Sequence, residues 1–157
     1  MLKYTDTEVV FKEVPDEIAL AINLSNCPIH CPGCHSPHLW EDIGDELNEE
    51  SISTLIKAHP GISCVSLMGG DLCPKEVSDL FGYVRGAFKE IKTSWYSGRN
   101  TVSKEIDLKN FDFIKIGPYI ESLGGLDKET TNQIMYEITE SGELVDITEK
   151  FRIKSWK

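Results

Sequence analysis

The stretch that decides the fold is EIALAINLSNCPIHCPGC, residues 17–34, where an aliphatic run gives way to a cysteine-rich segment. The run predicts a buried β-strand, because a short apolar segment bounded by turn-forming residues is typical of strands covered on both faces. Cys27, Cys31 and Cys34 follow with the spacing C-x3-C-x2-C, so we expect them on a loop at the carboxyl end of that strand. In parallel α/β sheets, ligands bind at this edge.

Helix and strand patterns alternate through the next hundred residues. Residues 48–59 predict a helix capped by Asn48, and an apolar stripe from Val77 to Ile91 predicts a second helix that begins near Pro74. Such alternation is typical of parallel sheets with right-handed crossovers. The apolar runs that predict the remaining strands of this sheet are residues 63–70, 92–98 and 111–120.

The C-terminal part of the chain has a different pattern. Two short extended segments flank Glu140, Ser141 and Gly142, which predict a hairpin turn. We therefore expect an α/β fold with a mostly parallel sheet and a C-terminal antiparallel hairpin. The chain has too few βα units to close an eight-stranded barrel.

Length and charge narrow the class of protein. A chain of 157 residues is of the size of one domain, so we expect a single domain over residues 1–157. The net charge of −10 argues against nucleic acid or an anionic membrane as the main partner, because such binding depends on attraction to phosphate. The first residues lack the apolar stretch of a signal peptide, and we expect a reducing, cytoplasmic location.

Three interpretations of the cysteine loop compete. Structural zinc would use the three cysteines with His35 or His38, although zinc ribbons usually pair two such segments. A redox dithiol would use Cys31 and Cys34, which leaves Cys27 without a role. A 4Fe-4S cluster held by three thiolates would leave one iron open, and an open metal position usually serves chemistry.

The loop also resembles a known family. C-x3-C-x2-C after the first strand is similar to the signature of radical S-adenosylmethionine (radical SAM) enzymes, and CPGCHSPHLW resembles the activating proteins of the anaerobic ribonucleoside-triphosphate reductase. The glycine pair in LMGGDLCP and the segment IKIGPYIESLGGLDKETTNQIMYEI are similar to later motifs of that family. The resemblance covers most of the chain, from about Asn23 to Glu137.

The resemblance implies an incomplete, radical-SAM-type βα barrel and a specific reaction. In this family, one electron from the cluster splits S-adenosylmethionine into methionine and a 5′-deoxyadenosyl radical. That radical takes a hydrogen atom from a glycine of the partner reductase and leaves a glycyl radical there. The partners implied are the class III (anaerobic) ribonucleoside-triphosphate reductase, as protein substrate, and a one-electron donor. The alternatives are a radical SAM enzyme with another target and a non-catalytic, zinc-stabilised α/β binding module.

The resemblance also assigns residues. It makes Cys27, Cys31 and Cys34 the cluster ligands and places residues on both sides of Cys34 against the bound cofactor. The glycine pair would let backbone groups approach the methionine amine, and the acid after it would complement the ammonium charge. Leu72 stands where the family usually has proline, which is a departure from the pattern. The expected cofactor-binding residues are Gly33, Cys34, His35, Gly69, Gly70 and Asp71.

Four positions have simpler expected roles. We expect Cys64 to be a small core residue and Cys73 to lie near a helix cap. His59 suits a helix end, where the dipole favours it, and Arg99 suits a solvated loop. The segment Asn132–Gln133 matches the family but has no role that the sequence defines.

Overall fold

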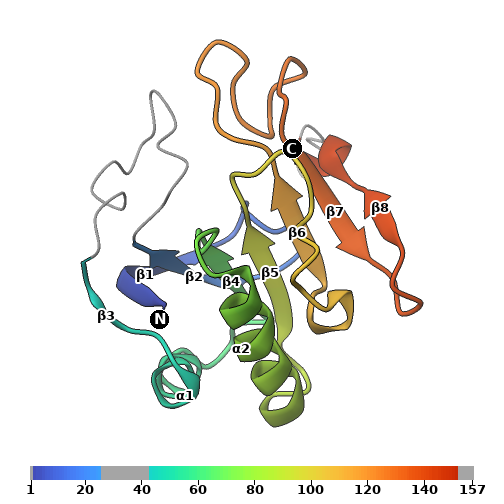
Figure 1. Ribbon diagram of the computed structural model, residues 1–157. Coiled ribbons are helices and arrows are strands. Elements are labelled where there is room, and N and C mark those ends of the chain that lie inside the picture. Colours follow the sequence, from blue (N-terminus) through green and yellow to red (C-terminus); the bar gives the residue numbers. More distant parts are fainter. Residues whose placement is uncertain (1, 26–42, 152–157) are drawn as a thin grey trace.

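A computed structural model describes residues 2–25 and 43–151 (Figure 1). The described strands form one mixed sheet with the order β3-β1-β2-β4-β5-β6-β7-β8. The elements, in chain order, are β1 (Lys3–Val10), β2 (Ala19–Leu24), β3 (Asp45–Glu46), α1 (Glu49–Ala58), β4 (Cys64–Met68), α2 (Pro74–Ala87), β5 (Lys92–Tyr96), the 3-10 turn η2 (Leu108–Asn110), β6 (Phe113–Ile116), β7 (Ile134–Ile138), β8 (Leu144–Asp146) and the 3-10 turn η3 (Thr148–Phe151).

The centre of the sheet is parallel, as the sequence predicts. β2 pairs with β4, β4 with β5 and β5 with β6, all in parallel. These strands correspond to the four predicted apolar runs. The predicted hairpin is confirmed as well, because β7 and β8 pair antiparallel on either side of a turn that contains Gly142.

Antiparallel strands also flank the other side of the sheet, and these strands were not predicted from the sequence. β1 pairs antiparallel with β2, and the two-residue β3 pairs with β1. Most of β1 is exposed or half-buried, so its sequence lacks the apolar run that identifies the central strands. The expectation of a mostly parallel sheet is therefore correct for the centre only.

Both predicted helices form. In α1, Asn48 accepts a hydrogen bond from the Ser51 backbone at 2.9 Å, and its own N–H donates to the Ser51 hydroxyl at 2.8 Å. This reciprocal cap stabilises a helix by roughly 1 kcal/mol. α2 begins at Pro74, as predicted, but ends at Ala87, before the apolar stripe does. His59 lies at the C-terminal end of α1, where its ring contacts the Leu55 carbonyl.

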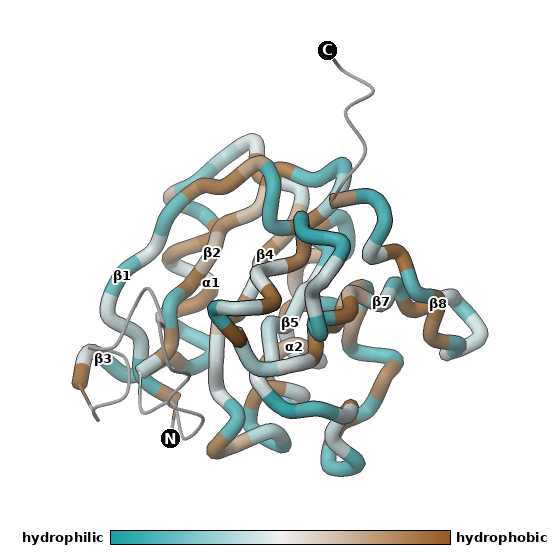
Figure 2. Tube along the Cα trace, turned by 90° about the horizontal axis from the view of Figure 1, so that it is seen from above, coloured by the Kyte–Doolittle hydropathy of each residue, from teal (hydrophilic) through white to brown (hydrophobic). Residues whose placement is uncertain are grey.

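The core lies mainly between the sheet and these helices. Alternate residues of the central strands, such as Leu20, Leu67 and Trp95, pack against Ile52 of α1 and Phe81 of α2. Hydrophobic segments accordingly follow the central strands when the molecule is seen from above (Figure 2). A second, smaller apolar cluster covers part of the opposite face of the sheet. One helix-covered face thus supplies most of the packing.

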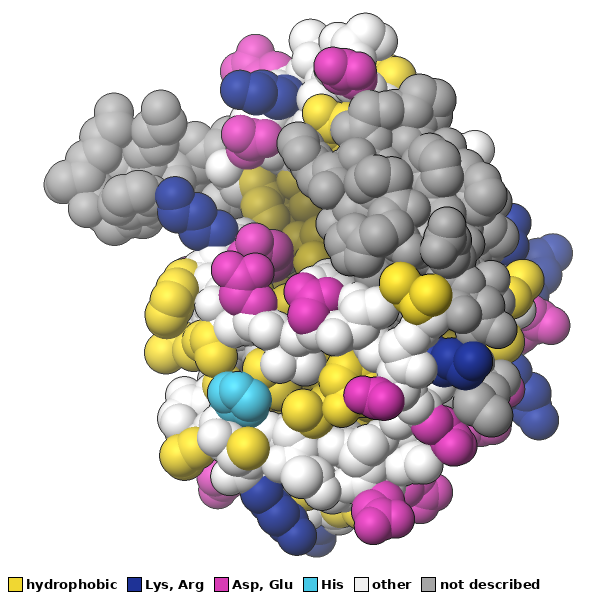
Figure 3. All heavy atoms as spheres, turned by 90° about the vertical axis from the view of Figure 1, so that its left-hand side faces the viewer, with side chains coloured by type: hydrophobic (Ala, Val, Ile, Leu, Met, Phe, Trp, Pro, Cys, Tyr) yellow, Lys and Arg dark blue, Asp and Glu magenta, His cyan; other side chains and the backbone are white. Residues whose placement is uncertain are grey.

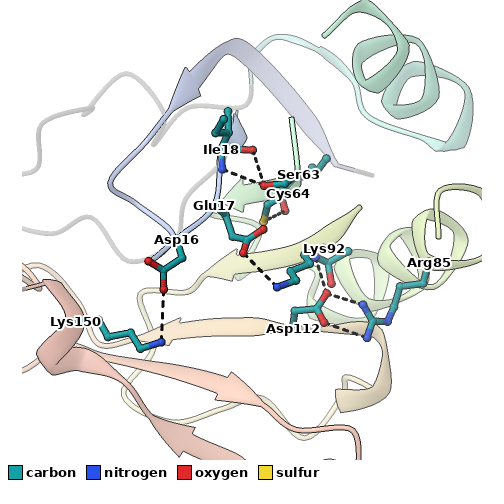
Figure 4. Close-up of polar contacts among 11 residues, drawn as sticks. Asp16, Glu17, Ile18, Ser63, Cys64, Arg85, Lys92, Asp112 and Lys150 are labelled. Atoms are coloured by element: carbon teal, nitrogen blue, oxygen red, sulfur yellow. Dashed lines mark hydrogen bonds and ion pairs between the residues drawn. The ribbon is translucent and has the colours of Figure 1, made fainter. Parts of the chain in front are cut away.

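Charged contacts join the elements at the amino edge of the parallel strands (Figure 4). The Asp112 carboxylate accepts hydrogen bonds from Arg85 of α2 at 2.6 and 3.3 Å and from the Thr93 backbone at 2.9 Å. Lys92 lies 3.2 Å from Glu17, and this hydrogen bond raises the pKa of the lysine. These contacts fix the starts of β5 and β6 relative to α2 and β2.

The surface agrees with the acidic composition. On the face shown in Figure 3, acidic side chains lie across the middle, and Lys and Arg lie mostly toward the rim. Among residues 2–25 and 43–151, no helix is long and apolar enough to cross a lipid bilayer.

Candidate functional site

The carboxyl edge of the sheet brings the family-like motifs together. β2, β4, β5 and β6 all end at this edge because they are parallel. The loops that leave β4, β5 and β6 begin with Gly69–Asp71, Ser97–Arg99 and Gly117–Pro118, respectively. Asn132–Gln133 arrives at the same edge, because β7 runs antiparallel to β6. Segments more than 60 residues apart in the chain therefore border one region.

β2, which precedes the cysteine segment in the chain, ends at this edge of the sheet. Cys27, Cys31 and Cys34 lie outside the described residues, as do Gly33 and His35. β2 ends at Leu24, so the described chain leads into this segment at the carboxyl edge. The predicted contacts of these five residues stay predictions.

The two described cysteines have other environments. Cys64 is completely buried in β4, and burial raises the pKa of its thiol, so it stays protonated and unsuited to ligation. Cys73 is half-buried at the N-cap of α2 and makes no side-chain capping bond. Both expectations for these residues are confirmed. Among residues 2–25 and 43–151, no three His, Cys, Asp or Glu side chains are grouped so that they could hold a metal ion.

The glycine pair has structural reasons to be glycine. Gly69 and Gly70 adopt φ angles of 109° and 90°, which side chains disfavour. A Cβ on Gly70 would lie 2.8 Å from Val77 and 2.9 Å from Leu24, so the residue is packed against the core. The Gly69 N–H donates to the Tyr96 carbonyl at 3.0 Å, and its carbonyl accepts from the indole of Trp95 at 2.6 Å. The backbone at the end of β4 is therefore rigidly held.

Asp71 connects the loops that follow β4 and β5. Its side chain is 2% exposed, and its oxygens accept hydrogen bonds from the Ser97 hydroxyl at 2.5 Å and from the Gly98 N–H at 2.9 Å. The Arg99 guanidinium, although the residue is exposed, donates to the Asp71 carbonyl at 3.3 Å. Both carboxylate oxygens of Asp71 thus have hydrogen-bond donors within the protein. Its predicted contact with an ammonium group stays a prediction.

Lys115 of β6 is 7% exposed and was not predicted from the sequence as a residue of this site. Its ammonium group donates to the Gly117 carbonyl at 3.1 Å and lies 5.3 Å from the centre of the Tyr96 ring. The sequence did contain a signal for this residue, because Lys115 is the one charged residue in the otherwise apolar run FIKI. Register places it in a row across the strands with Tyr96 and Met68, on the face away from the helices, next to the carboxyl edge.

Asn132 and Gln133 support the end of β6. Gln133 is buried, and its amide donates to the Gly117 carbonyl at 3.3 Å. The Asn132 Nδ2 donates to the Pro118 carbonyl at 3.0 Å. The Asn132 Oδ1 is buried but has no hydrogen-bond donor among the described residues. The family-like NQ segment thus holds the loop after β6 and presents one unpaired acceptor.

Comparisons with known proteins agree with the iron–sulfur interpretation of the cysteine loop. A family model described as a 4Fe-4S single cluster domain matches residues 18–138, which is most of the chain. The matched region begins at β2 and ends with β7, so it includes the cysteine loop, the loops that follow β4, β5 and β6, and Asn132–Gln133. No curated protein matches the chain.

Proposed function

Because the chain belongs to the 4Fe-4S single cluster domain family, we propose that it is a radical SAM activating enzyme of the cytoplasm, built as one domain with a partial βα barrel. Its proposed protein substrate is a class III ribonucleoside-triphosphate reductase, on which it generates a glycyl radical. One observation carries the proposal. The strand that leads into the cysteine loop ends at the same sheet edge as Gly69–Asp71, Gly117–Pro118 and Asn132–Gln133. Family membership favours iron–sulfur over the zinc alternative.

The proposed cofactors define the chemistry. Cys27, Cys31 and Cys34 would hold the cluster, which when reduced supplies one electron that splits S-adenosylmethionine into methionine and a 5′-deoxyadenosyl radical. Transfer of a hydrogen atom from the target glycine would give 5′-deoxyadenosine and the glycyl radical, and an external one-electron donor would supply the electron for each further turnover.

The described residues contribute by holding the carboxyl edge in one arrangement. Asp71 joins the loops after β4 and β5, and Trp95 fixes the carbonyl of Gly69. Lys115 and Gln133 fix the carbonyl of Gly117. Backbone groups held in this way are oriented before a ligand arrives, which lowers the cost of binding it.

Anaerobic purification with iron and sulfide analysis tests the cofactor, and product analysis tests the reaction. About four irons per chain and conversion of S-adenosylmethionine to 5′-deoxyadenosine by the reduced protein are expected. Cys31→Ala should abolish both, whereas Cys64→Ala, at a buried thiol of β4, should retain both. A loaded, reduced protein that leaves S-adenosylmethionine intact would contradict the proposal and indicate electron transfer.

The protein substrate needs a separate test. The reduced protein is mixed with the class III reductase and S-adenosylmethionine, and the glycyl radical is measured by electron paramagnetic resonance. Cleavage of S-adenosylmethionine without a radical signal on the reductase would overturn the partner and leave the radical chemistry in place.

A further inference from the structure

The starting point is the Asn132 Oδ1, an acceptor without a donor among the described residues, two residues before β7 begins. The Asn132 amide has a fixed orientation, because its Nδ2 donates to the Pro118 carbonyl at 3.0 Å. Turning the amide over would place two acceptor oxygens against each other. Its Oδ1 is therefore held in place, buried and without a donor in the part of the chain that the structure describes. A buried acceptor in this state is costly, so a donor from a ligand would be bound favourably.

The surrounding backbone is built to hold this amide in position. Gly117 has a φ of 100°, and a Cβ on it would lie 3.0 Å from the Gln133 Cα, 3.1 Å from the Asn132 carbonyl oxygen and 3.4 Å from the Asn132 Nδ2. The Gly117 N–H donates to the Arg99 carbonyl at 2.6 Å, which ties this turn to the loop after β5. The close approach of the two segments therefore depends on the absence of a side chain at position 117.

The position of Asn132 across the sheet limits which donor can reach it. β7 lies three strand spacings from β4, which is about 14 Å. In the proposed function, the methionine amine lies near Gly69 and Gly70 at the end of β4. A ligand anchored there reaches β7 with its opposite end, and in S-adenosylmethionine that end is the adenine base.

The adjoining loop offers space for a base. A cavity of about 530 Å³ is lined, among the described residues, by Tyr119, Ile120, Glu121 and Ser122, which follow Pro118 directly. The exposed lining is mostly apolar, and this size lies in the range of ligand pockets. A flat base suits an apolar pocket, and Asn132 is joined to the loop that lines this one through its hydrogen bond to the Pro118 carbonyl.

We propose that Asn132 recognises the nucleobase of S-adenosylmethionine, with its Oδ1 accepting a hydrogen bond from the exocyclic amine of adenine. This inference rests on the proposed function. Asn132 would then be a specificity-determining residue, because a base that carries a carbonyl oxygen at that position would face the Oδ1 with a second acceptor and leave it unpaired.

Ligand binding tests this with the whole, cluster-loaded protein and two probes. S-adenosylhomocysteine carries the exocyclic amine, and S-inosylhomocysteine carries a carbonyl oxygen in its place. We expect the wild-type protein to bind the adenosyl probe about tenfold more tightly, measured by isothermal titration calorimetry. In Asn132→Leu this preference should disappear, through weaker binding of the adenosyl probe.

A matched amide serves as the control. Asn110 also donates its Nδ2 to a carbonyl, that of Ser78 at 2.9 Å, but it lies in η2, before β6 begins. Asn110→Leu should lower thermal stability and keep the tenfold preference. Equal affinity of the wild-type protein for the two probes would overturn the inference, and so would an unchanged preference in Asn132→Leu. Failure of the wild-type protein to bind either S-adenosylmethionine or S-adenosylhomocysteine would instead overturn the proposed function.

Discussion

Gly117→Ala tests whether the turn after β6 is held by a close backbone approach. Gly117 combines a φ of 100° with two nearby backbone atoms, the Gln133 Cα and the Asn132 carbonyl oxygen. Gly61 is a matched control, because its φ is 99° and a Cβ there would meet nothing within 4 Å. The two substitutions therefore share the conformational cost and differ in the steric one.

The structure sets the expected size of each effect. Forcing alanine into the left-handed region costs roughly 1–2 kcal/mol at either position. At Gly117 the new methyl group, 3.0 Å from the Gln133 Cα, must also displace the chain that enters β7. Such overpacking typically adds about 1–3 kcal/mol. We expect Gly117→Ala to lose about 2–5 kcal/mol of unfolding free energy and Gly61→Ala only about 1–2 kcal/mol.

Urea denaturation followed by far-ultraviolet circular dichroism measures both losses under anaerobic conditions. The difference between the two variants isolates the steric part, because the strain cancels. Equal losses at Gly117 and Gly61 would refute the argument that the turn after β6 is closed against β7. The displacement should also disturb Gln133, whose amide donates to the Gly117 carbonyl.

Three further predictions concern other parts of the molecule. Asp71→Asn should lower the free energy of unfolding by about 2 kcal/mol, because it removes a charged acceptor of two hydrogen bonds. Asp79→Asn, at an exposed position of α2, should match the wild type in the same urea titration. Similar losses in both variants would be the contrary result. A double-mutant cycle of Arg85→Met and Asp112→Asn should give a coupling energy of about 1–2 kcal/mol. The two hydrogen bonds of the pair favour a high value, and the exposure of the side chains, 35% and 22%, limits it. Additive losses would show that the pair is not coupled. Burial raises the pKa of the Cys64 thiol, so above about pH 9 the unfolded chain releases a proton that the folded chain keeps. The unfolding free energy of the wild type should therefore fall by up to about 1.4 kcal/mol per pH unit from this group, and its difference from that of Cys64→Ala should shrink between pH 8 and pH 10. A constant difference would contradict the assignment.

Local signals in the sequence were sufficient for the parallel centre and the helices. Asn48 and Pro74 mark helix starts by their own chemistry, and both helices begin where these residues predict. β2 and β4 are covered by protein on both faces, so their aliphatic runs identify them. The end of α2 was harder to predict, since the apolar residues beyond Ala87 still pack against the core after the helix has ended.

Features that depend on distant parts of the chain could not be predicted. β1 is a strand because its backbone pairs with β2, and its half-exposed side chains give no apolar run. The hydrogen bonds of Asp71 could not be predicted either, because its donors, Ser97 and Gly98, lie 26 and 27 residues away in the chain. Lys115 is buried in the folded sheet, where Tyr96 and Gly117 from other parts of the sheet edge lie beside it.

The described polar groups at the carboxyl edge are of two kinds: several have hydrogen-bond donors within the protein, and the Asn132 Oδ1 has none among the described residues. Both oxygens of Asp71 have donors within the protein, and the carbonyl of Gly117 has two. Groups satisfied in this way gain little from a ligand, since binding would only exchange one hydrogen bond for another. The Asn132 Oδ1 differs, because no described residue donates to it. Discrimination between ligands at this edge should therefore depend on Asn132 far more than on Asp71, although removing Asp71 should cost the fold more.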